Sequence, residues 1–222
     1  MLFRGRRRSP SRREQWRDFA RRLELADAQQ QETRLREWLD LGESALAPLY
    51  GLRRSGQPTL FLFDQERARS GPTGSVTTLA TGVLLRAIAP LAAAPLRAQA
   101  RRNPVLESIE AGRTGSRRLA LSELPDFDAE VSVFARDEAA ARAWLTRPVQ
   151  RVMQRMLVDR GVSPMLVVGS RHMLVLCEGP QAAPFEALEA LAADLFTLFA
   201  MVEGTAGGAA GAPDGGADRA EG

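Results

Sequence analysis

The chain has 222 residues, of which 45% are hydrophobic, and its formal net charge is +3. This length is enough to bury one sizeable core, and the arginines, which make up all 30 basic residues, are spread too widely to indicate a phosphate-binding protein by number alone. The single cysteine, Cys177, excludes an intrachain disulfide, and together with the single histidine, His172, it excludes zinc sites built from several such ligands.

Residues 1–13 form a basic segment that contains six arginines and a proline. This composition predicts a disordered arm, and no apolar stretch follows it as in a secretory signal. We therefore expect a cytoplasmic protein. The most apolar stretch, residues 79–96, is interrupted by Arg86 and two prolines, so we expect no insertion into a membrane.

Residues 14–42 have the spacing of an N-terminal helical segment. Trp16, Phe19 and Leu23 recur at helical intervals, and Leu35 and Trp38 do so again further along. A polar run separates the two sets, which leaves open whether the segment is one long helix or two helices. Gly42 is expected to end it.

Residues 43–203 are expected to form one α+β domain. In its first half, short apolar stretches alternate with turn signals, which is typical of an antiparallel meander. Residues 60–63 are apolar at consecutive positions, so this strand should be buried on both faces. Strands are predicted at residues 49–54, 59–65, 76–88, 118–123 and 128–135.

Helices dominate the last third of this domain. Asp137 is expected to cap a helix that runs to Trp144, and Thr146 a second helix that runs to Arg160. Strands 165–168 and 173–177 should form a tight hairpin, and residues 185–202 a final helix with a stripe of leucines. Residues 204–222 are mostly Gly, Ala, Asp and Pro and are expected to be a disordered tail.

Several of these segments resemble an uncharacterised family of bacterial domains of unknown function. The resemblance is carried by the opening Trp-Arg-Asp-Phe-Ala-Arg-Arg-Leu at 16–23, by segment 51–64 with its glycine turn, by the run 76–85 and by the helix at 137–148. The family has a Leu-Thr-Pro step after that helix, whereas here Arg147 precedes Pro148. The resemblance implies no activity, substrate or catalytic residue.

Side chains with catalytic potential are few and separated. His172 and Cys177 are five residues apart on one expected strand, so they should point to opposite faces of the sheet. We expect Cys177 to be a buried structural thiol and His172 to be exposed in the hairpin turn. No nucleophile, base and orienting group can be assembled, so an enzyme is the least favoured function and no cofactor is expected.

The remaining polar motifs have simple structural explanations. Asp126, Asp128 and Glu130 alternate at the entrance of an expected strand and resemble a Mg²⁺ or Ca²⁺ site, but a solvated acidic rim explains them better, so no metal is predicted. The glycine loops at 71–75 and 112–118 lack the lysine of a phosphate-binding loop and are interpreted as turns. The phenylalanines of strand 59–65 would stack bases only on an open face of the sheet.

Two surfaces are left as binding candidates. The basic arm would bind nucleic acid or an anionic lipid surface through counterion release, or it would serve only as a solubilising tail. The residues concerned are Arg4, Arg6, Arg7, Arg8, Arg12, Arg13 and Arg17. The first and last helices carry apolar residues that would build a homodimer interface, although packing in the core explains them equally well. These residues are Trp16, Trp38, Leu191, Leu195 and Leu198.

Together these patterns predict an α+β fold, with an antiparallel sheet of about six strands, helices packed on one face and an N-terminal helical segment. The leading function is a non-catalytic binding or scaffold domain that recognises a protein partner or itself. The alternatives are non-specific binding to nucleic acid or an anionic surface through the arginine-rich arm, and an enzyme of unknown class.

Overall fold

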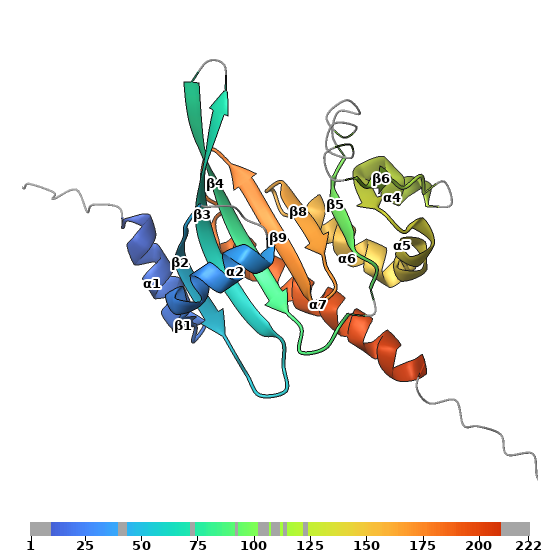
Figure 1. Cartoon of the computed structure of the whole chain (residues 1–222), viewed down its shortest axis with the longest axis horizontal. Coiled ribbons are helices and arrows are strands. Elements are labelled where there is room, and N and C mark those ends of the chain that lie inside the picture. The colour runs from blue at the N-terminus through green and yellow to red at the C-terminus, as the bar shows by residue number, and fades with distance from the viewer. Residues whose placement is uncertain are drawn as a thin grey trace, which may run out of the picture.

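The computed structural model describes residues 10–39, 44–71, 74–91, 93–101, 107, 112, 115–121 and 124–209. The chain alternates helices and strands around one large sheet (Figure 1). The helices are α1 (Arg12–Arg22), the 3₁₀ helix η1 (Gln29–Gln31), α2 (Glu32–Leu39), α4 (Pro125–Glu130), α5 (Glu138–Trp144), α6 (Arg147–Leu157) and α7 (Phe185–Ala209). The strands are β1 (Ala26–Asp27), β2 (Leu46–Leu52), β3 (Thr59–Gly71), β4 (Gly74–Arg86), β5 (Leu96–Ala100), β6 (Arg117–Arg118), β7 (Val131–Ala135), β8 (Pro164–Val168) and β9 (His172–Gly179).

The sheet is antiparallel throughout and has nine strands in the order β1-β2-β3-β4-β9-β8-β5-β7-β6. The antiparallel α+β architecture is confirmed, but the expected number of about six strands is wrong. One additional strand, β1, is a two-residue edge strand that is too short to leave a periodic signal, and the expected strand 118–123 is reduced to the two-residue edge strand β6. The late hairpin β8–β9 lies between β4 and β5 and so joins the two halves of the sheet.

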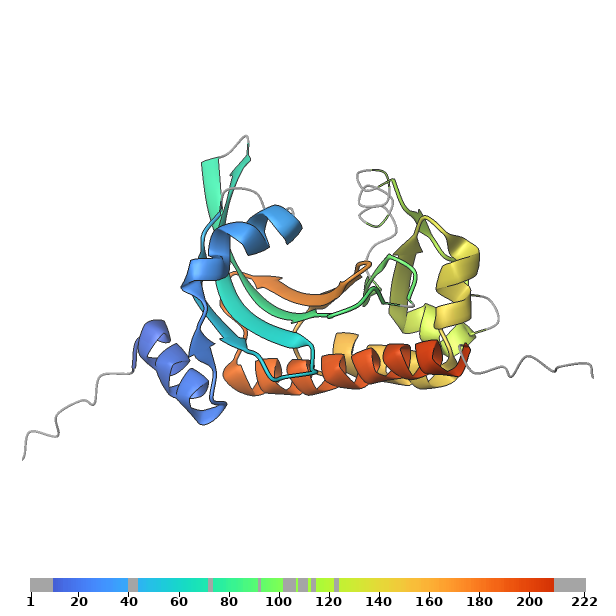
Figure 2. The same cartoon turned by 60° about the horizontal axis from the view of Figure 1, so that its bottom comes forward.

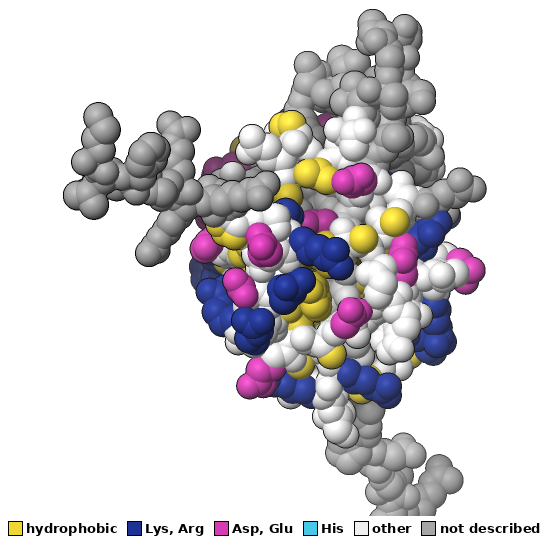
Figure 3. All heavy atoms as spheres, turned by 90° about the vertical axis from the view of Figure 1, so that its left-hand side faces the viewer, with side chains coloured by type: hydrophobic (Ala, Val, Ile, Leu, Met, Phe, Trp, Pro, Cys, Tyr) yellow, Lys and Arg dark blue, Asp and Glu magenta, His cyan; other side chains and the backbone are white. Residues whose placement is uncertain are grey.

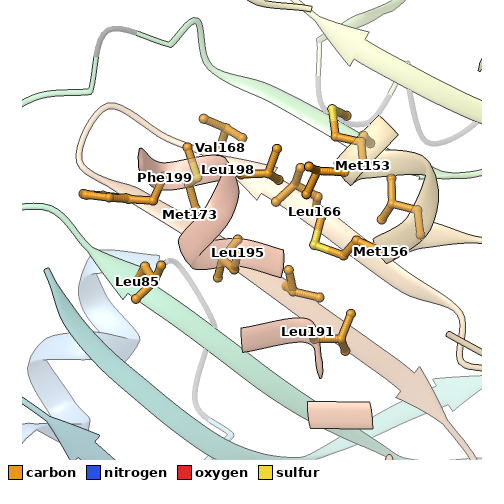
Figure 4. Packing of buried hydrophobic residues seen from close by; sticks show 14 of the residues in the cluster. Leu85, Met153, Met156, Leu166, Val168, Met173, Leu191, Leu195, Leu198 and Phe199 are labelled. Carbon is orange, nitrogen blue, oxygen red and sulfur yellow. The ribbon is translucent and has the colours of Figure 1, made fainter. Parts of the chain in front are cut away.

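One face of the sheet carries the main hydrophobic core. Alternate residues of the strands, such as Leu85, Leu166 and Met173, pack there against α6 and α7. The leucine stripe of α7 lies in the middle of this core, and Figure 4 shows Leu195 and Leu198 among side chains of the sheet and of α6. The expected packing of the helices after Asp137 and of the last helix on a common face is confirmed.

Helix α2 lies on the opposite face, which is the inner face of the curved sheet in Figure 2. Its Leu35 is buried against Phe61, Phe63 and Leu84 in a second, smaller hydrophobic cluster. Phe63 fits because Gly82 lies opposite it on β4, where a Cβ atom would come within 2.3 Å of the phenyl ring. The helices therefore cover both faces of the sheet, because α2 of the N-terminal helical segment lies on the face opposite to α6 and α7.

The N-terminal helical segment consists of two helices, separated by β1 and η1. Helix α1 begins at Arg12 because Ser11 and Glu14 form a capping box, in which each side chain binds the backbone N–H of the other residue. The hydrogen bond from the Ser11 backbone lowers the pKa of Glu14. Arg12 and Arg13, which belong to the predicted disordered arm of residues 1–13, are therefore helical.

Helix α1 is fixed to the sheet by the buried carboxylate of Asp64 on β3. Asp64 is 6% exposed and accepts hydrogen bonds from Thr81 Oγ1 at 2.8 Å, from Arg12 Nε at 3.0 Å and from Nε1 of the fully buried Trp16. Charge-assisted hydrogen bonds of this kind offset the cost of burying a carboxylate. Asp64 thus links the first helix to two strands.

A second buried carboxylate fixes α7 to α6. Asp194 is 2% exposed and accepts hydrogen bonds from Arg155 Nε at 2.8 Å and from Arg160 Nη2 at 2.6 Å. Two guanidinium groups therefore enclose one carboxylate at the C-terminal end of α6. Helix α7 continues to Ala209, beyond the residue at which we expected the tail to begin.

We predict that Asp64→Asn lowers the free energy of unfolding by about 3 kcal/mol, because the amide carries no charge and cannot accept from every donor that now faces it. Equilibrium unfolding in urea measures the change. The control is Asp18→Asn, since Asp18 forms an exposed ion pair with Arg21 at 3.2 Å, and its loss should cost less than about 0.5 kcal/mol. Equal losses in the two variants would contradict the role given to Asp64.

Candidate functional site

Arg86 and His172 lie opposite each other, where β4 pairs with β9. Directly opposite residues of an antiparallel pair point to the same face, and here this is the face that α2 covers. Trp38 of α2 contacts both side chains. Its ring centroid lies 4.7 Å from that of His172 and 5.2 Å from the guanidinium carbon of Arg86. Three residues from distant parts of the sequence therefore form one cluster.

His172 is half-buried in this cluster and is the first residue of β9. Its ring also lies over Gly169, where a Cβ atom would come within 2.2 Å of His172 Cε1. Burial lowers the pKa of His172 below its ordinary value of 6.5, because desolvation penalises the charged imidazolium. The expectation of an exposed turn histidine is wrong, since the indole of Trp38 covers it.

A cavity of about 320 Å³ lies beside this cluster. This volume is at the lower end of the range found for ligand-binding pockets. Leu35, which is buried, supplies an apolar wall, and Trp38 supplies a half-buried aromatic ring. The lining residues are Gln31, Arg34, Leu35, Glu37, Trp38 and Arg86, and we call this space the α2 cavity.

The two arginines of the α2 cavity have no acidic partner within the part of the chain that the structure describes. Arg86 is half-buried, and its guanidinium group lies over the ring of Trp38. Arg34 is exposed, and so is Glu37, the one carboxylate in the lining. The lining therefore carries two guanidinium groups and one carboxylate, which favours a ligand with negative charge.

An exposed hydrophobic side chain follows Arg86 just after the end of β4. Ile88 is 67% exposed and, in the described ranges, is the single large hydrophobic residue with such exposure. It follows Arg86 by two residues, so the two Cα atoms are at most about 7 Å apart. Its loop is fixed to the β8–β9 turn, because Ala87 N donates to Arg171 O at 2.8 Å and Leu91 N to Ser170 O at 2.7 Å.

Four of the five residues of the expected homodimer interface are not accessible to solvent. Trp16, Leu191, Leu195 and Leu198 are each 0% exposed and belong to the main core. They leave no side-chain surface for a second chain, and core packing accounts for them. Trp38 is the one member of the expected set that lies at the surface, where it lines the α2 cavity.

The expected anion-binding arginines are divided between two regions. Arg4, Arg6, Arg7 and Arg8 lie outside the described residues. Arg12 binds the buried Asp64, so its charge is already compensated. Arg13 and Arg17 are exposed on α1. Figure 3 shows arginines on this side of the molecule interspersed with carboxylates and hydrophobic atoms.

Cys177 and the three clustered carboxylates have structural environments. Cys177 is 6% exposed on the core face, opposite to His172, and burial raises the pKa of its thiol to about 12. Asp126, Asp128 and Glu130 lie on α4 and not on a strand. Arg118 binds Asp128 at 2.9 Å and Gln154 binds Glu130, as expected for an acidic rim.

Two further kinds of site are absent from the described residues. No group of three or more His, Cys, Asp or Glu side chains there could hold a metal ion. No described helix is long and apolar enough to cross a bilayer. Gly71 and Gly74 form the last pair of β3 and β4, and the two residues between them in the glycine loop at 71–75 lie outside the described part of the chain.

Sequence reasoning missed Arg34, Arg86 and Ile88 as candidate site residues. The available signal was Arg86, the one charged residue in the apolar stretch 79–96. A charge at the end of a buried strand points to a surface where the sheet becomes accessible. The proximity of Arg34 and Trp38 depends on how α2 lies across the sheet, for which the sequence has no comparable signal.

We predict that His172 titrates with a midpoint below 6.5, which nuclear magnetic resonance of this single histidine measures directly. Because the folded-state pKa is lowered, the unfolded state binds more protons below pH 6.5, so the stability that depends on neutral His172 is lost as the pH falls from 6.5 towards the folded-state pKa. His172→Gln should therefore show a shallower loss of stability between about pH 7 and 5. A midpoint at or above 6.5 would contradict the burial of the ring.

Comparison with protein-family models, with curated proteins and with solved structures found no match to this chain. The resemblance to a bacterial family of unknown function stays an expectation, and the function has to be argued from the α2 cavity and its surroundings.

Proposed function

We propose that the chain is a non-catalytic binding domain that recognises a protein, either a different one or a second copy of itself, through the surface around the α2 cavity. The observation that carries the proposal is the proximity of a half-buried tryptophan, an arginine without an acidic partner among the described residues, and the exposed Ile88. We call Arg34, Trp38, Arg86 and Ile88 the α2 surface.

The composition of the α2 surface supports a protein partner. Tryptophan and arginine are the residues that most often dominate the binding energy of protein interfaces. An exposed isoleucine next to them adds apolar area, which gains free energy when a partner removes it from water. The surface is also supported from beneath, because Leu35 anchors α2 on the sheet and two backbone hydrogen bonds fix the Ile88 loop. Such prior order reduces the entropy lost on binding.

We predict that a photo-crosslinking amino acid placed at Ile88 forms a discrete product with one protein in the cells that produce the chain. The same amino acid at Ala193, which is exposed on α7 on the other face of the sheet, should form no such product. Arg86→Ser in the Ile88-labelled chain should abolish the product. Mass spectrometry identifies the captured protein, and a product of twice the chain mass identifies a second copy.

Purified partner then provides the quantitative measurement. Trp38→Ser should weaken its binding by at least about tenfold, the scale of a typical interface hot spot. Products that are the same from Ile88 and Ala193, or that persist in the Arg86→Ser chain, would refute the proposal.

A second candidate function is binding to nucleic acid or an anionic surface by the arginine stripe of α1, and one observation favours it. Arg13, Arg17 and Arg21 are exposed and follow each other at intervals of four residues, so they lie along one side of the helix. Arg21 pairs with Asp18, but neither Arg13 nor Arg17 has an ion pair in the described part of the chain. The stripe continues the arginine-rich sequence that precedes α1.

We predict that, if this second function holds, the double variant Arg13→Gln, Arg17→Gln binds double-stranded DNA more weakly, with a salt dependence smaller by about two counterions. Fluorescence anisotropy at several salt concentrations measures both quantities. The control is Arg147→Gln, Arg151→Gln, because these exposed arginines of α6 carry the same charge elsewhere. Equal weakening of DNA binding in both variants would show an effect of net charge alone and would refute a specific role of the α1 arginines.

A shorter chain tests the contribution of the segment before α1. The deletion has to stop at residue 9, because Ser11 caps α1 and Arg12 binds Asp64. A deletion through residue 13 would remove both contacts and would confuse loss of binding with loss of stability.

A further inference from the structure

Arg86 differs from three other half-buried arginines in that no carboxylate of the described residues pairs with it. Arg12 pairs with Asp64, Arg118 with Asp128, and Arg160 with Asp194, all at 3.0 Å or less. A guanidinium group that is partly removed from water gains most from an ionised partner, since the shielding solvent is already reduced. Arg86 faces an aromatic ring and the α2 cavity instead.

We infer that the α2 cavity binds a carboxylate carried beside an aromatic or branched apolar side chain on a segment of a protein partner. This inference rests on the proposed function and names the chemistry that the site recognises. The guanidinium groups of Arg34 and Arg86 bind the carboxylate, and the apolar side chain packs on Leu35 and the exposed part of Trp38.

The cavity is suited to this pair of groups. Two polar lining residues, Gln31 and Arg34, and two apolar ones, Leu35 and Trp38, lie along one side of η1 and α2, because positions 31, 34, 35 and 38 share a helical face. A ligand side chain that packs on Leu35 and Trp38 therefore lies next to a ligand carboxylate that binds Arg34, so the two groups can come from the same or neighbouring residues of the ligand. A carboxylate accepts two N–H donors from one guanidinium group, which fixes its orientation as well as its position.

Glu37 sets a further condition on the ligand. It is exposed at the edge of the cavity and repels a second negative charge. A segment with a single carboxylate is therefore preferred to a run of acidic residues. The same reasoning makes Glu37 useful in a test. Its removal should strengthen the binding of an anion and should not weaken the apolar contacts of the ligand.

The chain's own ends fit the cavity less well than a partner segment does. The sequence before α1 is basic and is repelled by Arg34 and Arg86. Residues 210–222 contain three carboxylates but no aromatic or branched apolar side chain. They supply the charge without the group that would pack on Trp38, so neither of these two segments combines the groups that the cavity would take.

The test uses the indole N–H resonances of the full chain, assigned by single Trp→Phe variants. Trp16 and Trp144 are 0% and 8% exposed, so Trp38 is the tryptophan that a surface ligand reaches. Three probes are titrated to about 10 mM, beyond the millimolar affinity of weak ligands. They are acetyl-Asp-Phe-amide, its neutral match acetyl-Asn-Phe-amide, and acetyl-phenylalanine with a free carboxylate.

We expect a probe with a carboxylate to shift the Trp38 resonance saturably. We expect it to bind at least about tenfold more tightly than the neutral match. The Asp-Phe and acetyl-phenylalanine arms distinguish an acidic side chain from a chain terminus as the source of the carboxylate. Arg34→Gln should weaken binding by about tenfold or more, and Glu37→Gln should strengthen it by about threefold. Arg34→Gln is a suitable variant because the exposed side chain supports no other described residue.

Two controls keep the interpretation specific. Arg151→Gln removes an equivalent charge on α6 and should leave the affinity unchanged. Deletion of residues 210–222 should also leave it unchanged, and stronger probe binding after this deletion would show that the tail occupies the cavity, against the inference.

The remaining outcomes are equally decisive. Equal shifts with the neutral probe, no shift with any probe, or the same affinity in the Arg34→Gln chain would overturn the inference. The proposed function has its own measurement, because crosslinking from Ile88 does not depend on a carboxylate. A specific product from Ile88 without probe binding would leave the protein-binding function standing and remove only the carboxylate chemistry.

Discussion

The pairing of β9 with β4 on one side and β8 on the other is the constraint on which the molecule depends. It joins residues 79–86 to the last third of the chain, and without it the two halves of the sheet have no shared hydrogen bonds. The register of this pairing determines which side chains of β9 point to each face of the sheet. It puts Met173, Val175 and Cys177 under α7, and it puts His172 beside Arg86 under Trp38. A shift by one residue would exchange the two faces.

The buried charges differ between the two faces of the sheet. Asp64 holds α1, and Asp194 holds α7 on α6, each through guanidinium groups that leave the carboxylate compensated. Removal of either partner from such a pair is far more costly than loss of an exposed ion pair. The face under α2 is different. A single short helix lies over its smaller hydrophobic cluster, and Arg86 contacts the tryptophan of that helix but pairs with no carboxylate among the described residues.

Local patterns predicted most of the elements but not their arrangement. The cap at Asp137, the hairpin turn at Gly169 and the leucine stripe of α7 are short-range signals, and the structure contains each of these elements. Thr146 precedes α6 as expected, but its side chain makes no capping hydrogen bond, and the helix ends at Leu157 and not at Arg160. The order of the strands depends on pairings between residues about a hundred positions apart, which no local period encodes. The burial of Trp16 was ambiguous for the same reason. Its spacing fits a core or an interface, and what decides between them is Asp64, 48 residues away, which accepts the indole N–H.

The two candidate surfaces differ in the kind of binding that their charges support. The stripe on α1 is exposed to solvent, so its arginines act through water and are screened by salt. Such a surface attracts many anions and distinguishes little between them. Arg86 is half-buried beside an aromatic ring and an apolar wall, so its charge is shielded less and its direction is fixed. Specific recognition requires this combination of a poorly solvated charge with a shaped apolar contact. The α2 surface, where Arg86 combines partial burial with an aromatic contact, therefore fits the proposed recognition of a specific partner better than the stripe on α1 does.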